Sequence, residues 1–140
     1  MKKLNLAIIG YGRSGKDIHG QFLRSEENKY FDVKYAVEFD DYRRGLAEKH
    51  YPGCRTFSDY TKLLDYKDDI DIVVNASFSE MHYGITKNLL NCGFNVLVEK
   101  PFARTYYECC DLTKTAEDKG LLLTVFQQVF LAPSTNTPSK

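Results

Sequence analysis

The first residues that could do chemistry form a glycine-rich turn near the start of the chain. The spacing G-x-G-x-x-G follows directly after the apolar run Leu4–Ile9, and its residues are Gly10, Tyr11, Gly12, Arg13, Ser14 and Gly15. In such a turn the first glycine permits a tight bend, the second lets backbone approach a pyrophosphate, and the third allows close helix–strand packing. Because a strand-like run precedes the turn and a helix-like segment follows it, the pattern predicts dinucleotide binding rather than a plain glycine-rich turn.

An acidic residue stands where recognition of an adenosine ribose requires one. Glu38 closes the run Val33–Val37, about 20 residues past the turn, and its carboxylate could accept hydrogen bonds from both ribose hydroxyls. Asp40 and Asp41 are competitors for this role, but we expect them to cap the next helix instead. Arg43 and Arg44 leave NADP as the alternative cofactor, but Glu38 would repel a 2′-phosphate, so the pattern favours NAD.

Strand-like and helix-like segments alternate along the whole chain. Strands are expected at Leu4–Ile9, Val33–Val37, Arg55–Phe57, Ile70–Ala76, Phe94–Val98 and Leu121–Phe126. Helices are expected at Ser14–Ser25, Tyr42–His50, Ser58–Leu64, Glu80–Asn91 and Thr105–Lys119, with N-caps at Ser58 and Thr105 and a C-cap at Gly120. This alternation is typical of βαβ units. It predicts an α/β fold with a doubly wound parallel sheet, a Rossmann fold with strand order 3-2-1-4-5-6.

Composition excludes several classes of protein. The chain has 140 residues, 43% of them hydrophobic and 27% charged, and no formal net charge. It is long enough for one domain with a real core. We expect no nucleic-acid partner, because there is no basic stripe with interleaved aromatic residues, and no membrane span, because no apolar run approaches ~20 residues. The cysteines lack C-x-x-C spacing, so we expect no metal site and a cytoplasmic protein with reduced thiols.

A triplet after the fifth expected strand, Glu99-Lys100-Pro101, makes the pattern specific. Together with the glycine turn, Glu38 and a loop ending in His82, it makes residues 3–128 resemble the N-terminal domain of the Gfo/Idh/MocA family. This is the glucose–fructose oxidoreductase and inositol dehydrogenase group. The resemblance implies an NAD(P)-dependent oxidoreductase that transfers hydride between a nicotinamide cofactor and a sugar, polyol or related small-molecule substrate.

The resemblance also implies roles for particular residues. Lys100 would be catalytic, because an ammonium at the carboxyl edge of the sheet can polarise a substrate oxygen. The further residues implied at the cofactor are Ala76, Ser77, Phe78, His82, Glu99, Lys100 and Pro101. The family usually has threonine-proline in place of Ser77-Phe78, and His82 could either contact the cofactor or hold its own loop. His19 and His50 have no motif around them, so we expect them at the surface.

Family members continue after the sixth strand into a second domain that supplies the substrate pocket. In this chain we expect a dinucleotide-binding domain over residues 1–128, an irregular or disordered tail over 129–140, and no substrate domain. The chain would then be a fragment, a truncated product or a frameshifted reading, and inactive alone. The alternative function is a non-catalytic NAD(H)-binding regulatory or sensor module. Self-association is expected from the apolar residues Phe126, Val129, Phe130 and Leu131.

Overall fold

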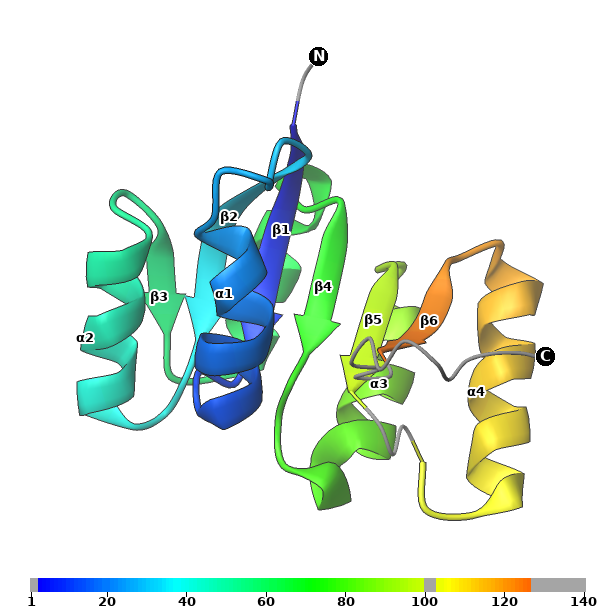
Figure 1. Cartoon of the computed structure of the whole chain (residues 1–140). Helices are drawn as coiled ribbons and strands as arrows, with labels where there is room; N and C mark the ends of the chain where they lie inside the picture. Colours follow the sequence, from blue (N-terminus) through cyan, green and yellow to red (C-terminus); the bar gives the residue numbers. More distant parts are fainter. Residues whose placement is uncertain (1–2, 100–102, 127–140) are drawn as a thin grey trace, which may run out of the picture.

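The protein is described by a computed structural model for residues 3–99 and 103–126. Six parallel strands form one sheet in the order β3-β2-β1-β4-β5-β6 (Figure 1). Their bounds are β1 (Leu4–Ile9), β2 (Phe31–Val37), β3 (Arg55–Phe57), β4 (Ile72–Asn75), β5 (Val96–Glu99) and β6 (Leu123–Phe126). The predicted α/β class and the doubly wound Rossmann order are confirmed.

Helical segments connect successive strands. They are η1 (Arg13–His19, a π-helix), α1 (Gly20–Leu23), α2 (Asp41–His50), η2 (Tyr60–Asp69, a 3₁₀-helix), η3 (Ser79–Met81, also 3₁₀), α3 (His82–Asn91) and α4 (Tyr106–Lys119). Among the described residues, none of these helices combines the length and apolar character that a membrane span requires.

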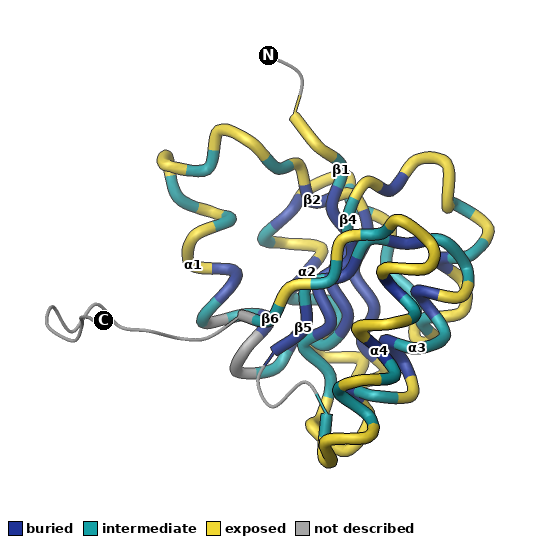
Figure 2. The backbone as a smooth tube through the Cα atoms, turned by 90° about the vertical axis from the view of Figure 1, so that its right-hand side faces the viewer, coloured by how far each residue is buried: buried dark blue, intermediate teal, exposed yellow. Residues whose placement is uncertain are grey.

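Apolar side chains project from both faces of the sheet, as expected for parallel strands that are covered on two sides. Leu6 and Ile8 of β1 belong to a core formed with α2, whereas Ala7 and Ile9 belong to a larger core formed with η2, α3 and α4. Figure 2 shows the buried residues gathered along the strands and the exposed residues on the outer sides of the helices. Because both faces of the sheet are covered, a ligand is expected to bind at the ends of the strands.

Several predicted helix ends are confirmed. Asp40 caps α2 by accepting the Arg43 N–H at 2.9 Å, and Thr105 caps α4 by accepting the Glu108 N–H at 3.1 Å. Gly120 ends α4 in the left-handed conformation, with φ of +66°. These caps satisfy backbone groups that a helix terminus otherwise leaves unpaired.

Two local predictions are wrong. The N-cap after β3 is Asp59 and not Ser58, because η2 begins one residue later and the Asp59 carboxylate accepts the Thr61 N–H at 3.0 Å. The expected helix over 14–25 is a π-helix that becomes an α-helix at Gly20 and ends at Leu23. The predicted tail over 129–140 lies outside the described residues.

Candidate functional site

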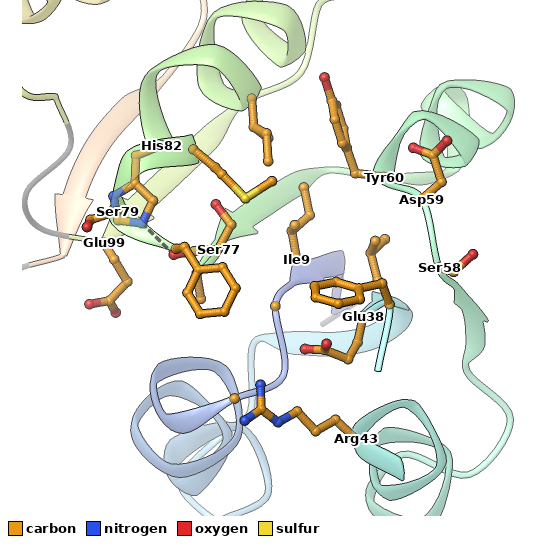
Figure 3. A pocket seen from close by; sticks show the side chains of 18 residues that line it. Ile9, Glu38, Arg43, Ser58, Asp59, Tyr60, Ser77, Ser79, His82 and Glu99 are labelled. Atoms are coloured by element: carbon orange, nitrogen blue, oxygen red, sulfur yellow. Dashed lines mark hydrogen bonds between the residues drawn. The ribbon is translucent and has the colours of Figure 1, made fainter. Parts of the chain in front are cut away.

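A cavity of about 670 Å³ opens where the strands end (Figure 3). Residues at or just after the ends of five strands line it: Ile9, Gly10, Glu38, Ser58, Ala76 and Glu99. In Figure 3, His82 and Glu99 lie at one end of this cavity and Asp59 and Tyr60 at the other, with Glu38 between them. The crevice outside the carboxyl ends of parallel strands is the usual ligand site of open α/β sheets.

The three glycines of the turn are required for different reasons. Gly10 has φ of +91°, and a Cβ there would overlap the Ala76 carbonyl oxygen. A Cβ at Gly15 would overlap the Gly10 carbonyl oxygen, so the packing itself requires both glycines. At Gly12, by contrast, the group that a Cβ would meet among the described residues is the Arg43 guanidinium, with Nη1 at 3.3 Å. Gly12 lines the cavity, so its missing side chain keeps room there for a ligand.

Glu38 is held in place by the backbone around it. Its Oε1 accepts the Tyr11 N–H at 2.8 Å and its Oε2 accepts the Asp40 N–H at 3.0 Å. The residue is buried but lines the cavity. A carboxylate offers about four lone-pair sites, so two acceptor positions remain for a ligand hydroxyl.

The loop after β4 is fixed by a buried polar network. Asn75 donates to Thr86 Oγ1 at 3.0 Å, while its Oδ1 accepts the Ser77 hydroxyl at 2.6 Å and the Ser77 N–H at 3.2 Å. The His82 ring donates from Nε2 to the Ser77 carbonyl at 2.7 Å. His82 therefore holds its own loop, and its ring also lines the cavity beside Ala76 and Phe78.

Tyr11 points away from the cavity and anchors the turn to α2. Its hydroxyl lies 2.6 Å from His50 Nδ1 and accepts from Arg24 Nη1 at 3.0 Å. Arg24 Nη1 also lies 3.2 Å from the same His50 nitrogen. Burial, followed by the charges of Arg24 and Lys16, lowers the pKa of His50. His50, expected at the surface, is partly exposed there, and this contact buries the rest of its ring.

The other histidine expected at the surface, His19, is buried, so that expectation is wrong. His19 is 8% exposed and its Nε2 contacts the carboxylate of Glu99, which is 9% exposed and lines the cavity. The partners lie 80 residues apart in the sequence, so no local pattern could have revealed them.

Some predicted site residues lie beyond what the structure describes. Lys100 and Pro101 are outside the described residues, and so are the side chains of Arg13 and Ser14. Conversely, the cavity has lining residues that the sequence reasoning did not single out as ligand contacts: Phe39, Asp59, Tyr60, Ser79, Met81 and Ile85. Most of them closely follow β2, β3 or β4, so the rule that ligands bind at strand ends could have found them.

The fold and the cavity define a dinucleotide-binding Rossmann domain. Residues 4–127 match the Gfo/Idh/MocA family, described as an oxidoreductase family with an NAD-binding Rossmann fold. The chain belongs to this family.

Relatives and solved structures agree with this assignment. An uncharacterized oxidoreductase of Schizosaccharomyces pombe is 33% identical over 91% of the chain and 34% of its own length. The NADP⁺-dependent scyllo-inositol 2-dehydrogenase IolW of Bacillus subtilis is 26% identical over 88% of the chain and 33% of its own length. The structure of GenD2 from gentamicin A biosynthesis, in complex with NAD, superposes with a TM-score of 0.80 at 25% identity, over 89% of the chain and 34% of GenD2. The chain thus spans about a third of the length of these relatives.

The different reasons for the three glycines can be tested by alanine substitution. Gly12→Ala should weaken NAD⁺ binding at least about tenfold, since the methyl group enters the cavity, and should change the free energy of unfolding by no more than about 0.5 kcal/mol. Gly15→Ala should destabilise the fold itself. Calorimetric titration and denaturant unfolding measure the two effects.

Gly45→Ala is the matched control, because a Cβ at Gly45 in the middle of α2 would meet no described atom within 4 Å beyond its own helix backbone. It should leave binding unchanged and stabilise the helix by about 0.5–1 kcal/mol. Equal losses of binding and stability in Gly12→Ala and Gly15→Ala would contradict the distinction between them.

The environment of His50 predicts a pH dependence of stability. Because its pKa is lowered from 6.5 in the folded protein, protonation favours the unfolded chain as the pH falls below that value. The free energy of unfolding should therefore fall between about pH 7.5 and about pH 5.5, and His50→Gln should remove part of that fall. Chemical denaturation of both proteins at the two pH values measures it. An unchanged pH dependence of stability in His50→Gln would show that the folded protein does not disfavour protonation of this histidine.

Proposed function

We propose that this chain is the NAD(H)-binding domain of an oxidoreductase that transfers hydride between the nicotinamide and a sugar, polyol or related small molecule. The observation that carries the proposal is the position of Gly12. It lines the cavity, and the packing of the fold does not itself require a glycine there, so the space that its missing side chain leaves is available to a ligand. Family membership supports the same conclusion. The names of relatives support the substrate class, since IolW acts on scyllo-inositol.

The order of the strands gives the proposed direction of the cofactor. The pyrophosphate would lie over the turn at Gly12, after the central strand β1. The adenosine ribose would lie toward β2, where the Glu38 carboxylate has acceptor positions left. The nicotinamide would then lie toward β4 and β5, near His82 and Glu99, which occupy that end of the cavity.

The chain's own residues would bind and orient, and the nicotinamide would supply the hydride chemistry. Backbone N–H groups of the turn would hold the pyrophosphate. Lys100, which follows Glu99 in the sequence, would donate a hydrogen bond to the substrate oxygen and so stabilise negative charge that develops there. This role rests on the resemblance of Glu99-Lys100-Pro101 to the family's triplet.

Cofactor preference follows from two opposite charges at the adenosine end. The buried Glu38 carboxylate would repel a 2′-phosphate, whereas Arg43 reaches into the cavity from α2 and could attract one. Within the described residues no hydrogen bond or ion pair holds the Arg43 guanidinium, so a large part of its charge stays open to water and is screened. Glu38 lies deeper and is fixed, and we propose that it decides the preference in favour of NAD.

Titration of NADH and NADPH into the protein tests this preference. NADH should bind more tightly than NADPH. Glu38→Gln should narrow the difference between the two affinities, because it removes the repulsion between the carboxylate and the 2′-phosphate. Arg43→Ala should affect NADPH more than NADH and leave NADH the better ligand. Tighter binding of NADPH that is lost in Arg43→Ala would overturn the assignment of Glu38.

A polypeptide of these 140 residues alone should bind the cofactor without turning over sugars or polyols. Holding a substrate carbon against the nicotinamide lowers the activation free energy, by about 7–11 kcal/mol in well-oriented systems. In the family that task falls to a second domain. The absorbance of NADH formed from NAD⁺ and inositol or glucose measures it, with a full-length family dehydrogenase as the positive control. Clear NADH formation at ordinary substrate concentrations would contradict the prediction.

A further inference from the structure

We infer that His19 is a positioning residue for the nicotinamide half of the cofactor site, acting through the carboxylate of Glu99. The inference rests on the proposed binding of NAD(H) and goes beyond it, because it assigns a role to a residue outside the glycine turn and outside the triplet. Neither residue has an obvious structural need for the other, since apolar side chains form the core on both faces of the sheet.

The contact joins two elements that the sequence keeps far apart. His19 is the last residue of η1 and Glu99 is the last residue of β5. The carboxylate accepts a hydrogen bond from the imidazole, and both side chains are about nine-tenths buried. Breaking such a pair by removing one partner leaves a buried polar group without compensation, which is costly. Glu99 is therefore held in one orientation for as long as His19 is present.

The position of Glu99 places this contact at the nicotinamide end. Glu99 is the contribution of β5 to the cavity wall, whereas Glu38 lines the wall after β2. Strands β1 and β4 lie between them in the sheet. A dinucleotide whose pyrophosphate crosses at Gly12 and whose adenosine lies by Glu38 must extend its other nucleotide toward Glu99.

The π-helix explains how His19 reaches β5. Wider π turns change the direction in which successive side chains leave a helix, and such segments are frequent at functional sites. The π segment of η1 ends at His19, and regular α-helix resumes at Gly20. The Gly20 N–H donates to the carbonyl of Gly15, the last glycine of the turn, and this bond between residues five apart is the hydrogen bond of a π-helix. The π geometry thus links the glycine turn to the end of β5.

The test compares two ligands that differ only in the nicotinamide. NADH and ADP-ribose are titrated into the unaltered protein and into His19→Ala, Glu99→Ala and the double variant. His19→Ala should weaken NADH binding about tenfold, equivalent to about 1.4 kcal/mol, and leave ADP-ribose within about twofold. The double variant should lose no more NADH affinity than the more affected single variant, because both substitutions break the same contact.

Two further variants separate positioning from folding. His19→Gln keeps a donor for the carboxylate and should retain NADH affinity within about threefold; it also carries the test if His19→Ala does not fold. Lys114→Ala, at an exposed position on α4, is the control and should change neither ligand. Equal weakening of both ligands by His19→Ala, or no weakening of NADH, would overturn the inference, as would additive losses in the double variant. Failure of the unaltered protein to bind ADP-ribose would instead refute the proposed function on which the inference rests.

Discussion

Close backbone contact around Gly10 is the constraint on which the site depends. The carbonyl oxygen of Ala76 packs against the Cα of Gly10, and the carbonyl oxygen of Gly10 packs against Gly15. These contacts leave no room for a Cβ at either glycine, and they bring together the ends of β1 and β4 and the start of η1. The floor of the cavity is consequently backbone, which leaves the central part of the site open for a phosphate group.

Polar side chains around that floor are held by hydrogen bonds within the protein itself. Glu38 accepts two backbone N–H groups, Asn75 and His82 hold the loop after β4, and His19 holds Glu99. Burying a polar group is costly unless it is hydrogen-bonded, so each of these contacts has a reason to persist in the free protein. When a site is already ordered, less of the binding free energy is lost to ordering its side chains as the ligand binds.

The sequence predicts the sheet and the turn but not the long-range contacts. Apolar runs alternating with helical segments suffice for the strand order, and the glycine spacing suffices to identify the turn. The burial of His19 is out of reach of the sequence, because its partner lies 80 residues away. The sequence pattern predicts a helix after the turn but does not distinguish a π-helix from an α-helix there. Ser58 and Asp59 are both good N-caps, so sequence alone could not choose between them. The role of Lys100 stays a prediction.

Amide NMR of the protein during titration with NAD⁺ tests the central claim most directly, since it reports where the ligand binds. The account predicts that the amide signals of Gly10, Gly12, Glu38 and Ser77 shift with one common dissociation constant. Signals on the outer face of α4, such as that of Cys110, should stay in place. Shifts confined to other surfaces, or no shift at the turn at saturating NAD⁺, would contradict the account.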